Sequence, residues 1–246
     1  RALQRLTAVK NVRLAVRQGS TEENAMRNVR IFFEKKDIAK YISHLDLMRC
    51  FSRAIKRAGI SIWYTEGFNP RPFMTFSLPL SLGTESFCES VDVRITDEMT
   101  DEEIVKRLNG VMPTGIVVTS ACEPVHKADE IRWARFIITF ETNDKQKVLE
   151  SVNNKISADE IIVEKQGKKG RKKVLKQIDI KGDISSYELC ECENGVKLTV
   201  VLSAGMRNNI NPTLLLDAVT VDVKELIEAA DIVKEKMYLE DMSEFC

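Results

Sequence analysis

The chain has 246 residues with 37 basic and 37 acidic side chains, and 43% of its residues are hydrophobic. This composition is typical of a globular protein and argues against disorder of the whole chain, while the length predicts one large or two small domains. The longest apolar runs fall far short of the about 20 residues that span a bilayer, and the N-terminus lacks the continuous apolar stretch of a secretory signal. We therefore expect a cytoplasmic protein that does not act at a membrane.

The zero net charge hides a segregation along the sequence. Residues 145–182 carry 11 basic and 5 acidic side chains, whereas residues 183–246 carry 5 basic and 13 acidic ones. Such charge blocks occur on ordinary solvated surfaces and also where a protein meets an anionic partner. Composition alone leaves both interpretations open.

The first 25 residues are expected to be a leader or linker, either native or left by cloning. They carry five basic side chains against two acidic ones, and Gly19–Asn24 has the composition of a linker. Met26 is placed like a natural start. We leave residues 1–25 out of the fold prediction.

Residues 26–128 are predicted to form an α+β domain of the ferredoxin-like type. Ser43 begins a helix with Asp46 at its third position, which is a capping-box spacing, and Gly59 ends it. Thr100 caps a second helix. Around these helices the pattern predicts extended segments at 28–35, 60–64, 73–80, 89–95 and 116–122. With two of the three extended segments between the helices taken as the paired strands, the order is β-α-β-β-α-β, which predicts an antiparallel sheet with both helices packed on one face.

Residues 129–246 are predicted to form a second α+β domain with a similar opening. Asn194-Gly195 predicts a hairpin, and Pro212 predicts a helix start. The other predicted elements are strands at 134–141, 160–164, 175–180, 187–192 and 196–202, and helices at 144–155 and Lys224–Glu235. A diverged duplication is compatible with this order, although the sequence shows no repeat. The basic turn at 167–173 is either a hairpin tip or a contact to RNA.

The first predicted helix carries a basic stripe opposite its apolar one. Arg49, Arg53, Lys56 and Arg57 lie at i, i+4, i+7 and i+8, so they share one helix face. A solvated surface tolerates such a stripe. The other interpretation is a face that binds an anion, most naturally the phosphate backbone of a nucleic acid.

Two neighbouring segments add candidate binding residues. His44, which follows Tyr41 and the capping Ser43, is either structural or able to bind a phosphate or act as a general base. The loop at 66–72 contains one glycine and two prolines, which suit a rigid turn. Its other side chains could contact RNA by stacking on a base or pairing with a phosphate. They are Phe68, Asn69 and Arg71.

The cysteines do not predict a metal or redox site. Cys190 and Cys192 would lie on the same face of a strand, but with His44 and His126 as the two histidines few ligands could complete a zinc site. We expect both thiols to be reduced and metal-free. The sequence also lacks the phosphate-binding glycine loops and the metalloprotease and serine-hydrolase motifs, so we expect no cofactor.

Several motifs resemble one bacterial family. They are Tyr41-Ile42-Ser43-His44-Leu45-Asp46-Leu47-Met48-Arg49, Arg53–Gly59, Tyr64–Pro72 and Ser77–Gly83, with weaker points at 178–181 and 211–213. Together they resemble the radical-SAM-linked domain of unknown function, which occurs free or fused behind B12-binding radical SAM proteins. The resemblance implies a companion radical SAM enzyme. This chain lacks the C-x-x-x-C-x-x-C spacing that would hold a [4Fe–4S] cluster itself.

Three functions remain open on these grounds. The first hypothesis is a non-enzymatic accessory protein that binds RNA, or an RNA–protein substrate, and presents it to a radical SAM enzyme. The second is a metal-independent RNA endonuclease in which His44 deprotonates a 2′-hydroxyl, by fold-level analogy with endoribonucleases that process CRISPR repeats. The third is a protein–protein adaptor that uses the acidic C-terminal third and binds no RNA.

Overall fold

The structure is a computed structural model that describes residues 26–169, 172–206 and 208–246. The predicted leader at 1–25 lies outside these ranges, as does part of the predicted basic turn at 167–173. Within the described residues, no helix has the length and apolarity needed to cross a membrane.

The N-terminal half has the predicted ferredoxin-like topology. β1 pairs with both β3 and β4, and β2 pairs with the other edge of β3, every pair being antiparallel. In chain order the elements are β1 (Arg27–Lys35), α2 (His44–Arg57), β2 (Met74–Phe76), β3 (Glu85–Ile95), α3 (Asp101–Asn109) and β4 (Ile116–Cys122), with a short 3-10 helix at Asp37–Tyr41. The strand order is therefore 4-1-3-2 when the four strands of this half are numbered along the chain.

Two extended segments of this half are shorter than predicted. Residues 60–64 form isolated bridges, between Ile62 and Ile95 and between Tyr64 and Pro72, and the segment predicted at 73–80 pairs only over Met74–Phe76. Prolines at 72 and 79 flank this short strand and cannot donate a ladder hydrogen bond, which limits its length.

The C-terminal half repeats the same topology. β10 pairs with β5, β5 with β9 and β9 with β8, all antiparallel, which again gives the order 4-1-3-2. A separate hairpin of β6 and β7 is inserted between α4 and β8. The elements are β5 (Trp133–Glu141), α4 (Lys145–Ser157), β6 (Ile162–Lys169), β7 (Lys172–Asp179), β8 (Ile184–Cys192), β9 (Gly195–Ser203), α5 (Pro212–Val219) and β10 (Ala229–Tyr238), with 3-10 turns at Ala128–Glu130, Lys181–Asp183 and Lys224–Leu226.

The helix predicted at Lys224–Glu235 is wrong. A single 3-10 turn is followed by β10, whose side chains point alternately into and out of the core. Ile232 and Lys234 share the buried face, and a register shift after Lys234 brings Met237 inward as well. Because Lys234 occupies an inward position, the alternation of apolar and polar residues that marks a strand is interrupted. The sequence of this segment therefore resembles a charged amphipathic helix.

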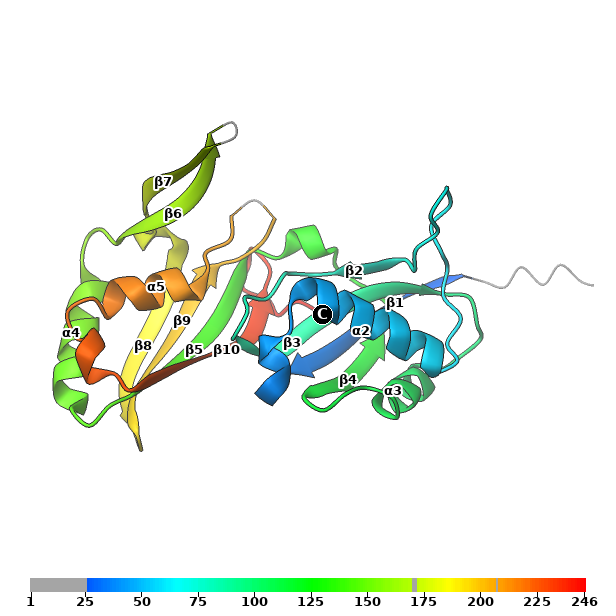
Figure 1. The fold of residues 1–246 in the computed structure, drawn as a ribbon, viewed down its shortest axis with the longest axis horizontal. Helices are drawn as coiled ribbons and strands as arrows, with labels where there is room; N and C mark the ends of the chain where they lie inside the picture. The colour runs from blue at the N-terminus through cyan, green and yellow to red at the C-terminus, as the bar shows by residue number, and fades with distance from the viewer. Residues whose placement is uncertain (1–25, 170–171, 207) are drawn as a thin grey trace, which may run out of the picture.

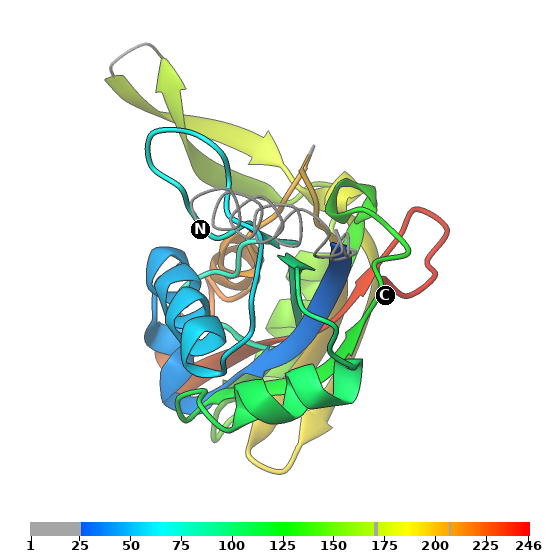
Figure 2. The same cartoon turned by 90° about the vertical axis from the view of Figure 1, so that its right-hand side faces the viewer.

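The two halves are joined into one eight-stranded sheet. β3 and β10 run parallel and pair at Glu85–Val233 and Ser86–Lys234. Figure 1 shows α2 and α5 in front of the strands of their own halves, and Figure 2 shows the C-terminal segment on the side away from α2. Each half has its own apolar core between strands and helices. The fold is thus α+β, with two ferredoxin-like units in one sheet.

Candidate nucleic-acid interface

Local sequence sets both the start and the orientation of α2. The Ser43 hydroxyl oxygen accepts a hydrogen bond from the Asp46 amide at 3.2 Å, as the capping spacing predicts. The inward side chains include Leu47 and Phe51, and the Phe51 ring packs 4.6 Å from that of Phe33 on β1. Because this apolar face is fixed in the core, the opposite face of α2 must point to solvent.

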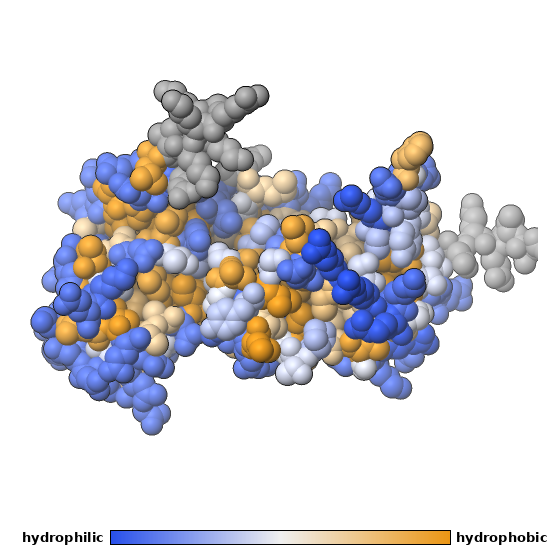
Figure 3. Space-filling model, in the orientation of Figure 1, coloured by the Kyte–Doolittle hydropathy of each residue, from blue (hydrophilic) through white to orange (hydrophobic). Residues whose placement is uncertain are grey.

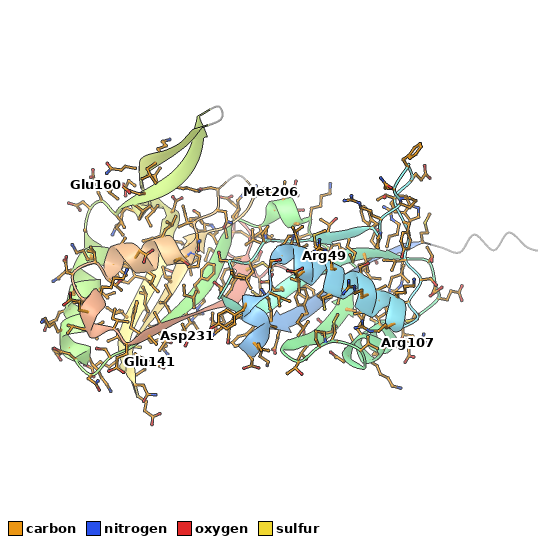
Figure 4. All side chains as sticks on the ribbon, in the orientation of Figure 1. Arg49, Arg107, Glu141, Glu160, Met206 and Asp231 are labelled. Carbon is orange, nitrogen blue, oxygen red and sulfur yellow. The ribbon has the colours of Figure 1, made fainter. Side chains whose placement is uncertain are left out.

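Three of the four predicted cations line a groove beside the exposed face of α2. The groove has a volume of about 510 Å³, and Lys56 is exposed on the same helix without lining it. The lining residues are Asp46, Arg49, Cys50, Arg53, Arg57, Val111 and Pro113. Figure 3 shows strongly hydrophilic residues over α2, and Figure 4 shows Arg49 projecting from the outer side of this helix.

The arginines of the groove differ in their partners. Arg49 Nη1 lies 3.0 Å from Asp46 Oδ1, and Arg57 Nη2 donates to the carbonyl oxygen of Val111 at 2.9 Å. Within the described residues Arg53 has no ion pair or side-chain hydrogen bond. The Ser43 hydroxyl and the Arg49 guanidinium keep the pKa of Asp46 below its usual value, so this carboxylate is ionised. The groove thus presents three guanidinium groups and one carboxylate.

Cys50 lies among these arginines and is half-buried. Burial raises the pKa of its thiol, while the nearby Arg57 and Arg53 act in the opposite direction. A thiol with a raised pKa is mostly protonated near neutral pH, which makes it a poor nucleophile. We therefore assign Cys50 to the wall of the groove.

Two other predicted residues lie at or just before the N-terminal end of α2, Tyr41 being the last residue of the preceding 3-10 helix. His44 is the first residue of α2 and is half-buried, with its ring edge-on to Phe76 at 5.3 Å. Tyr41 is exposed, and the Lys40 ammonium lies 5.6 Å from its ring centre. Neither side chain lines the groove. The structure therefore does not place Tyr41 and His44 in one site with the three arginines.

The predicted loop stands apart from the groove as a narrow hairpin. The Thr65 amide donates to the Arg71 carbonyl at 2.9 Å, and the Arg71 amide donates to Thr65 Oγ1 at 3.1 Å. Phe68 near the tip is fully exposed, and Asn69 and Arg71 are also exposed. Figure 1 shows this loop projecting from the N-terminal half. None of these three side chains lines the groove.

Sequence reasoning missed four residues of the groove wall. In the sequence, Asp46 signals only a helix cap, and Cys50 is one of six cysteines that do not form a metal-binding motif. Val111 and Pro113 come from the turn after α3, far away in sequence. Helical spacing predicts both Asp46 and Cys50, because they are four residues apart and lie on the same face of α2 as Arg49 and Arg53. Long-range contacts such as those of Val111 have no local signal.

All six cysteines are free thiols, and Cys190 and Cys192 are half-buried on β8. In the described part of the chain, no group of three or more His, Cys, Asp or Glu side chains could hold a metal ion. That Cys190 and Cys192 bind no metal stays a prediction, to be checked by metal analysis of the purified protein.

The fold and the groove define a two-unit α+β protein with an arginine-lined helix face. The family model described as an uncharacterized protein conserved in bacteria (DUF2344) matches residues 28–212. This match covers most of the chain, so the chain belongs to that family. No curated protein matches it.

Two solved structures are similar over most of this chain. A crystal structure of a Cbf5-Nop10-Gar1 complex matches with 11% identity and a TM-score of 0.47, covering 85% of this chain and 48% of that one. A crystal structure of an unknown protein from Galdieria sulphuraria matches with 12% identity and a TM-score of 0.25, covering 85% of this chain and 98% of that one. This chain thus spans about half the length of the first. At these TM-scores neither likeness bears on function.

Proposed function

We propose that this protein binds RNA on the exposed face of α2 and acts, without catalysing a reaction itself, with a partner radical SAM enzyme. The observation that carries the RNA proposal is the groove in which Arg49, Arg53 and Arg57 converge. The radical SAM partner rests on the resemblance of the motifs at 41–49, 53–59, 64–72 and 77–83 to the radical-SAM-linked domain.

Arginine guanidinium groups suit phosphate binding better than lysine ammonium groups would. Each presents a planar fork of donors that matches two phosphate oxygens. Arg49, Arg53 and Arg57 follow one another along α2, so successive backbone phosphates could meet them in order. An exposed aromatic ring such as Phe68 can stack on an unpaired base beyond the groove. These features favour RNA over a small anion.

Charge reversal tests the proposal. In Arg49→Glu/Arg53→Glu/Arg57→Glu we expect RNA binding to weaken and the slope of log K against log salt concentration to flatten by about 2, since each lost phosphate contact on a single strand removes about 0.7. The apolar face of α2 is untouched, and exposed substitutions change the free energy of unfolding little. Gel shifts at several salt concentrations provide the measurement.

The control variant is Arg107→Glu on α3. Arg107 is exposed and pairs with Glu103 at 2.7 Å, and it lies outside the groove; Figure 4 shows its position. We expect this variant to bind RNA as the unchanged protein does. A folded triple variant with unaltered affinity and salt slope would mean that the arginines form only a solvated face. Failure of the unchanged protein to bind RNA would favour the adaptor hypothesis.

Contact with a radical SAM enzyme needs a separate test. We expect a radical SAM protein to be cross-linked to the native protein in cells, and the RNA bound to both to be recovered from the same complex. Recovery of RNA without any radical SAM protein would leave the RNA-binding proposal standing and remove the partner.

The endonuclease alternative depends on His44. This residue begins α2, the helix that carries the groove, and its half-buried ring is partly accessible. We predict that the purified chain does not cleave RNA in EDTA and that His44→Ala reduces binding. Site-specific cleavage that leaves a 2′,3′-cyclic phosphate and disappears in His44→Ala would instead establish the endonuclease.

A further inference from the structure

A second groove lies on the face of the N-terminal sheet that carries no helices. Its volume is about 510 Å³, and its floor contains Asn28 on β1, Thr75 on β2 and Arg94 on β3. These positions alternate along the strands with the apolar residues that pack under α2 and α3, so they point to the opposite side. The segment at 124–129 forms a wall.

Arg94 is held in this groove by two aromatic rings. Its guanidinium carbon lies 5.0 Å from the ring centres of both Trp63 and Phe73. These two residues also join the base of the 64–72 loop, because the Phe73 amide donates to the Trp63 carbonyl at 3.0 Å. Cation–π contacts with two rings restrict the positions that the guanidinium group can take.

The donors of Arg94 are only partly used. Its Nε donates to Asn28 Oδ1 at 3.2 Å, and within the described residues the two terminal amino groups have no acceptor. Arg30 is different, since it is fully buried and its Nε and Nη2 contact the two oxygens of Asp92 at 2.8 and 2.9 Å. With this pair neutralised, the remaining charged side chains of the groove are Arg94, Lys127 and Asp129, with His126 held by Glu130.

We infer that this groove binds one nucleotide unit of single-stranded RNA, with the phosphate on Arg94 and the base on Phe73. A guanidinium group that is held in place can donate two parallel hydrogen bonds to one phosphate. An aromatic ring beside it offers a surface on which any base can stack. The Asn28 amide and the Thr75 hydroxyl supply donors and acceptors for the edge of a base. A duplex does not fit this chemistry, because its bases are already stacked and paired.

The position of the groove extends the proposed RNA interface. The chain leaves the end of α2, passes through Trp63, forms the loop that carries Phe68 and returns at Phe73. A strand that crosses this loop would reach both the arginines of α2 and Arg94. The inference rests on the proposed function for the identity of the ligand, and it adds that the RNA must be single-stranded on this side.

Trp63 provides a direct readout of this groove. The chain has two tryptophans, so Trp133→Phe leaves Trp63 as the single tryptophan, whose fluorescence is excited apart from that of the tyrosines. The probes are a single-stranded hexanucleotide, the same sequence annealed to its complement, adenosine 5′-monophosphate and inorganic phosphate. We expect the hexanucleotide to change Trp63 fluorescence and to bind more tightly than the other three probes.

The variants separate this groove from the rest of the surface. Arg94→Gln and Phe73→Leu should each weaken hexanucleotide binding about tenfold, and Arg94→Lys should fall between Arg94→Gln and the unchanged protein, because it keeps the charge but loses the fork. Arg107→Gln is the matched control and should leave binding unchanged. Circular dichroism melting curves of each variant establish that it is folded.

The outcomes also separate the two proposals. A Trp63 response that persists in Arg49→Glu/Arg53→Glu/Arg57→Glu and is lost in Arg94→Gln supports this groove as a site of its own. Equal binding of the duplex or of adenosine 5′-monophosphate would overturn the assignment to single-stranded RNA. A silent Trp63 in a protein that still binds longer RNA through α2 would overturn this inference and leave the proposed function intact.

Discussion

Three charged side chains are buried where the two halves of the sheet meet. Lys35 on β1, Glu89 on β3 and Lys234 on β10 are 2%, 3% and 1% exposed. Lys234 Nζ lies 2.6 Å from Glu89 Oε1, and Lys35 Nζ donates to the Ile42 carbonyl at 3.1 Å. Removing charges from water is costly, so each depends on the partners that the fold provides.

Removing one partner of the Lys234–Glu89 pair should therefore destabilise the protein strongly. We expect Lys234→Met to lower the free energy of unfolding by about 3–5 kcal/mol, because the buried Glu89 carboxylate would lose the ammonium group 2.6 Å from its Oε1. Urea unfolding gives the value. In Glu89→Leu/Lys234→Met most of this loss should be recovered, and equal losses in the single and double variants would contradict the pairing.

Lys35 predicts a pH dependence of stability. Burial lowers its pKa, Lys234 lowers it further and Glu89 opposes the change. Above the folded-state pKa and below the usual value of about 10.4, the unfolded chain holds a proton that the folded chain lacks, so the free energy of unfolding rises with pH. In urea unfolding, we expect the free energy of unfolding of the unchanged protein minus that of Lys35→Met to increase as the pH rises toward about 10. A constant difference would contradict this.

These buried charges could not be predicted from the sequence. A lysine within a strand normally points to solvent, and Lys234 gives no local sign of its inward position. The basic stripe on α2 was predictable for the opposite reason, since the i, i+4 spacing of Arg49 and Arg53 needs only the helix period. The burial of Lys234 depends on pairing between strands that are distant in the sequence. The basic stripe on α2 depends only on local helix geometry.

At the scale of elements, the segments with capping residues were predicted best. Ser43, Thr100 and Asn211 each accept a hydrogen bond from the first turn of their helix. β10 resembles a helix in the sequence because its inward face contains a lysine, although its start carries no such cap. Capping is local chemistry that a sequence displays, whereas burial of a charge depends on the assembled sheet.

The cap of α2 can be tested directly. We expect Ser43→Ala to lower the free energy of unfolding by about 1 kcal/mol, because the Asp46 amide loses its acceptor and the Asp46 carboxylate loses the hydroxyl 2.7 Å away. The matched control is Ser52→Ala in the middle of the same helix, where alanine is a better helix former and no loss is expected. Thermal unfolding of both variants gives the comparison, and equal shifts would contradict a capping role.

At the scale of the whole molecule, the sequence predicts two α+β units but not their union. The predicted order of elements indicates a ferredoxin-like sheet for the first half, whereas in the second half the fourth strand, β10, is predicted as a helix. The structure confirms the α+β class and shows the strand order 4-1-3-2 in both halves. The parallel contact of β3 with β10 involves two residue pairs, and nothing in either strand signals it. The domain boundary between residues 128 and 129 stays a prediction.

The contacts across the union predict how the molecule unfolds. Lys234 of one half pairs with Glu89 of the other, and Arg30 lies under Phe245 with its guanidinium carbon 4.3 Å from the ring centre. Ser81 Oγ also donates to Asn211 Oδ1 at 3.2 Å. Because the Lys234–Glu89 pair and the Arg30–Phe245 contact are buried and join one half to the other, we expect both halves to unfold in one transition.

Trp63 and Trp133 allow this to be measured, since one lies in each half. In Trp133→Phe the fluorescence of Trp63 should follow the same urea curve as far-ultraviolet circular dichroism, which reports both halves, and Trp133 should do the same in Trp63→Phe. Adding Lys234→Met should lower the fluorescence and dichroism midpoints together, since the other contacts across the union remain. Separate midpoints with Lys234 intact would mean that the halves are independent domains despite the shared sheet.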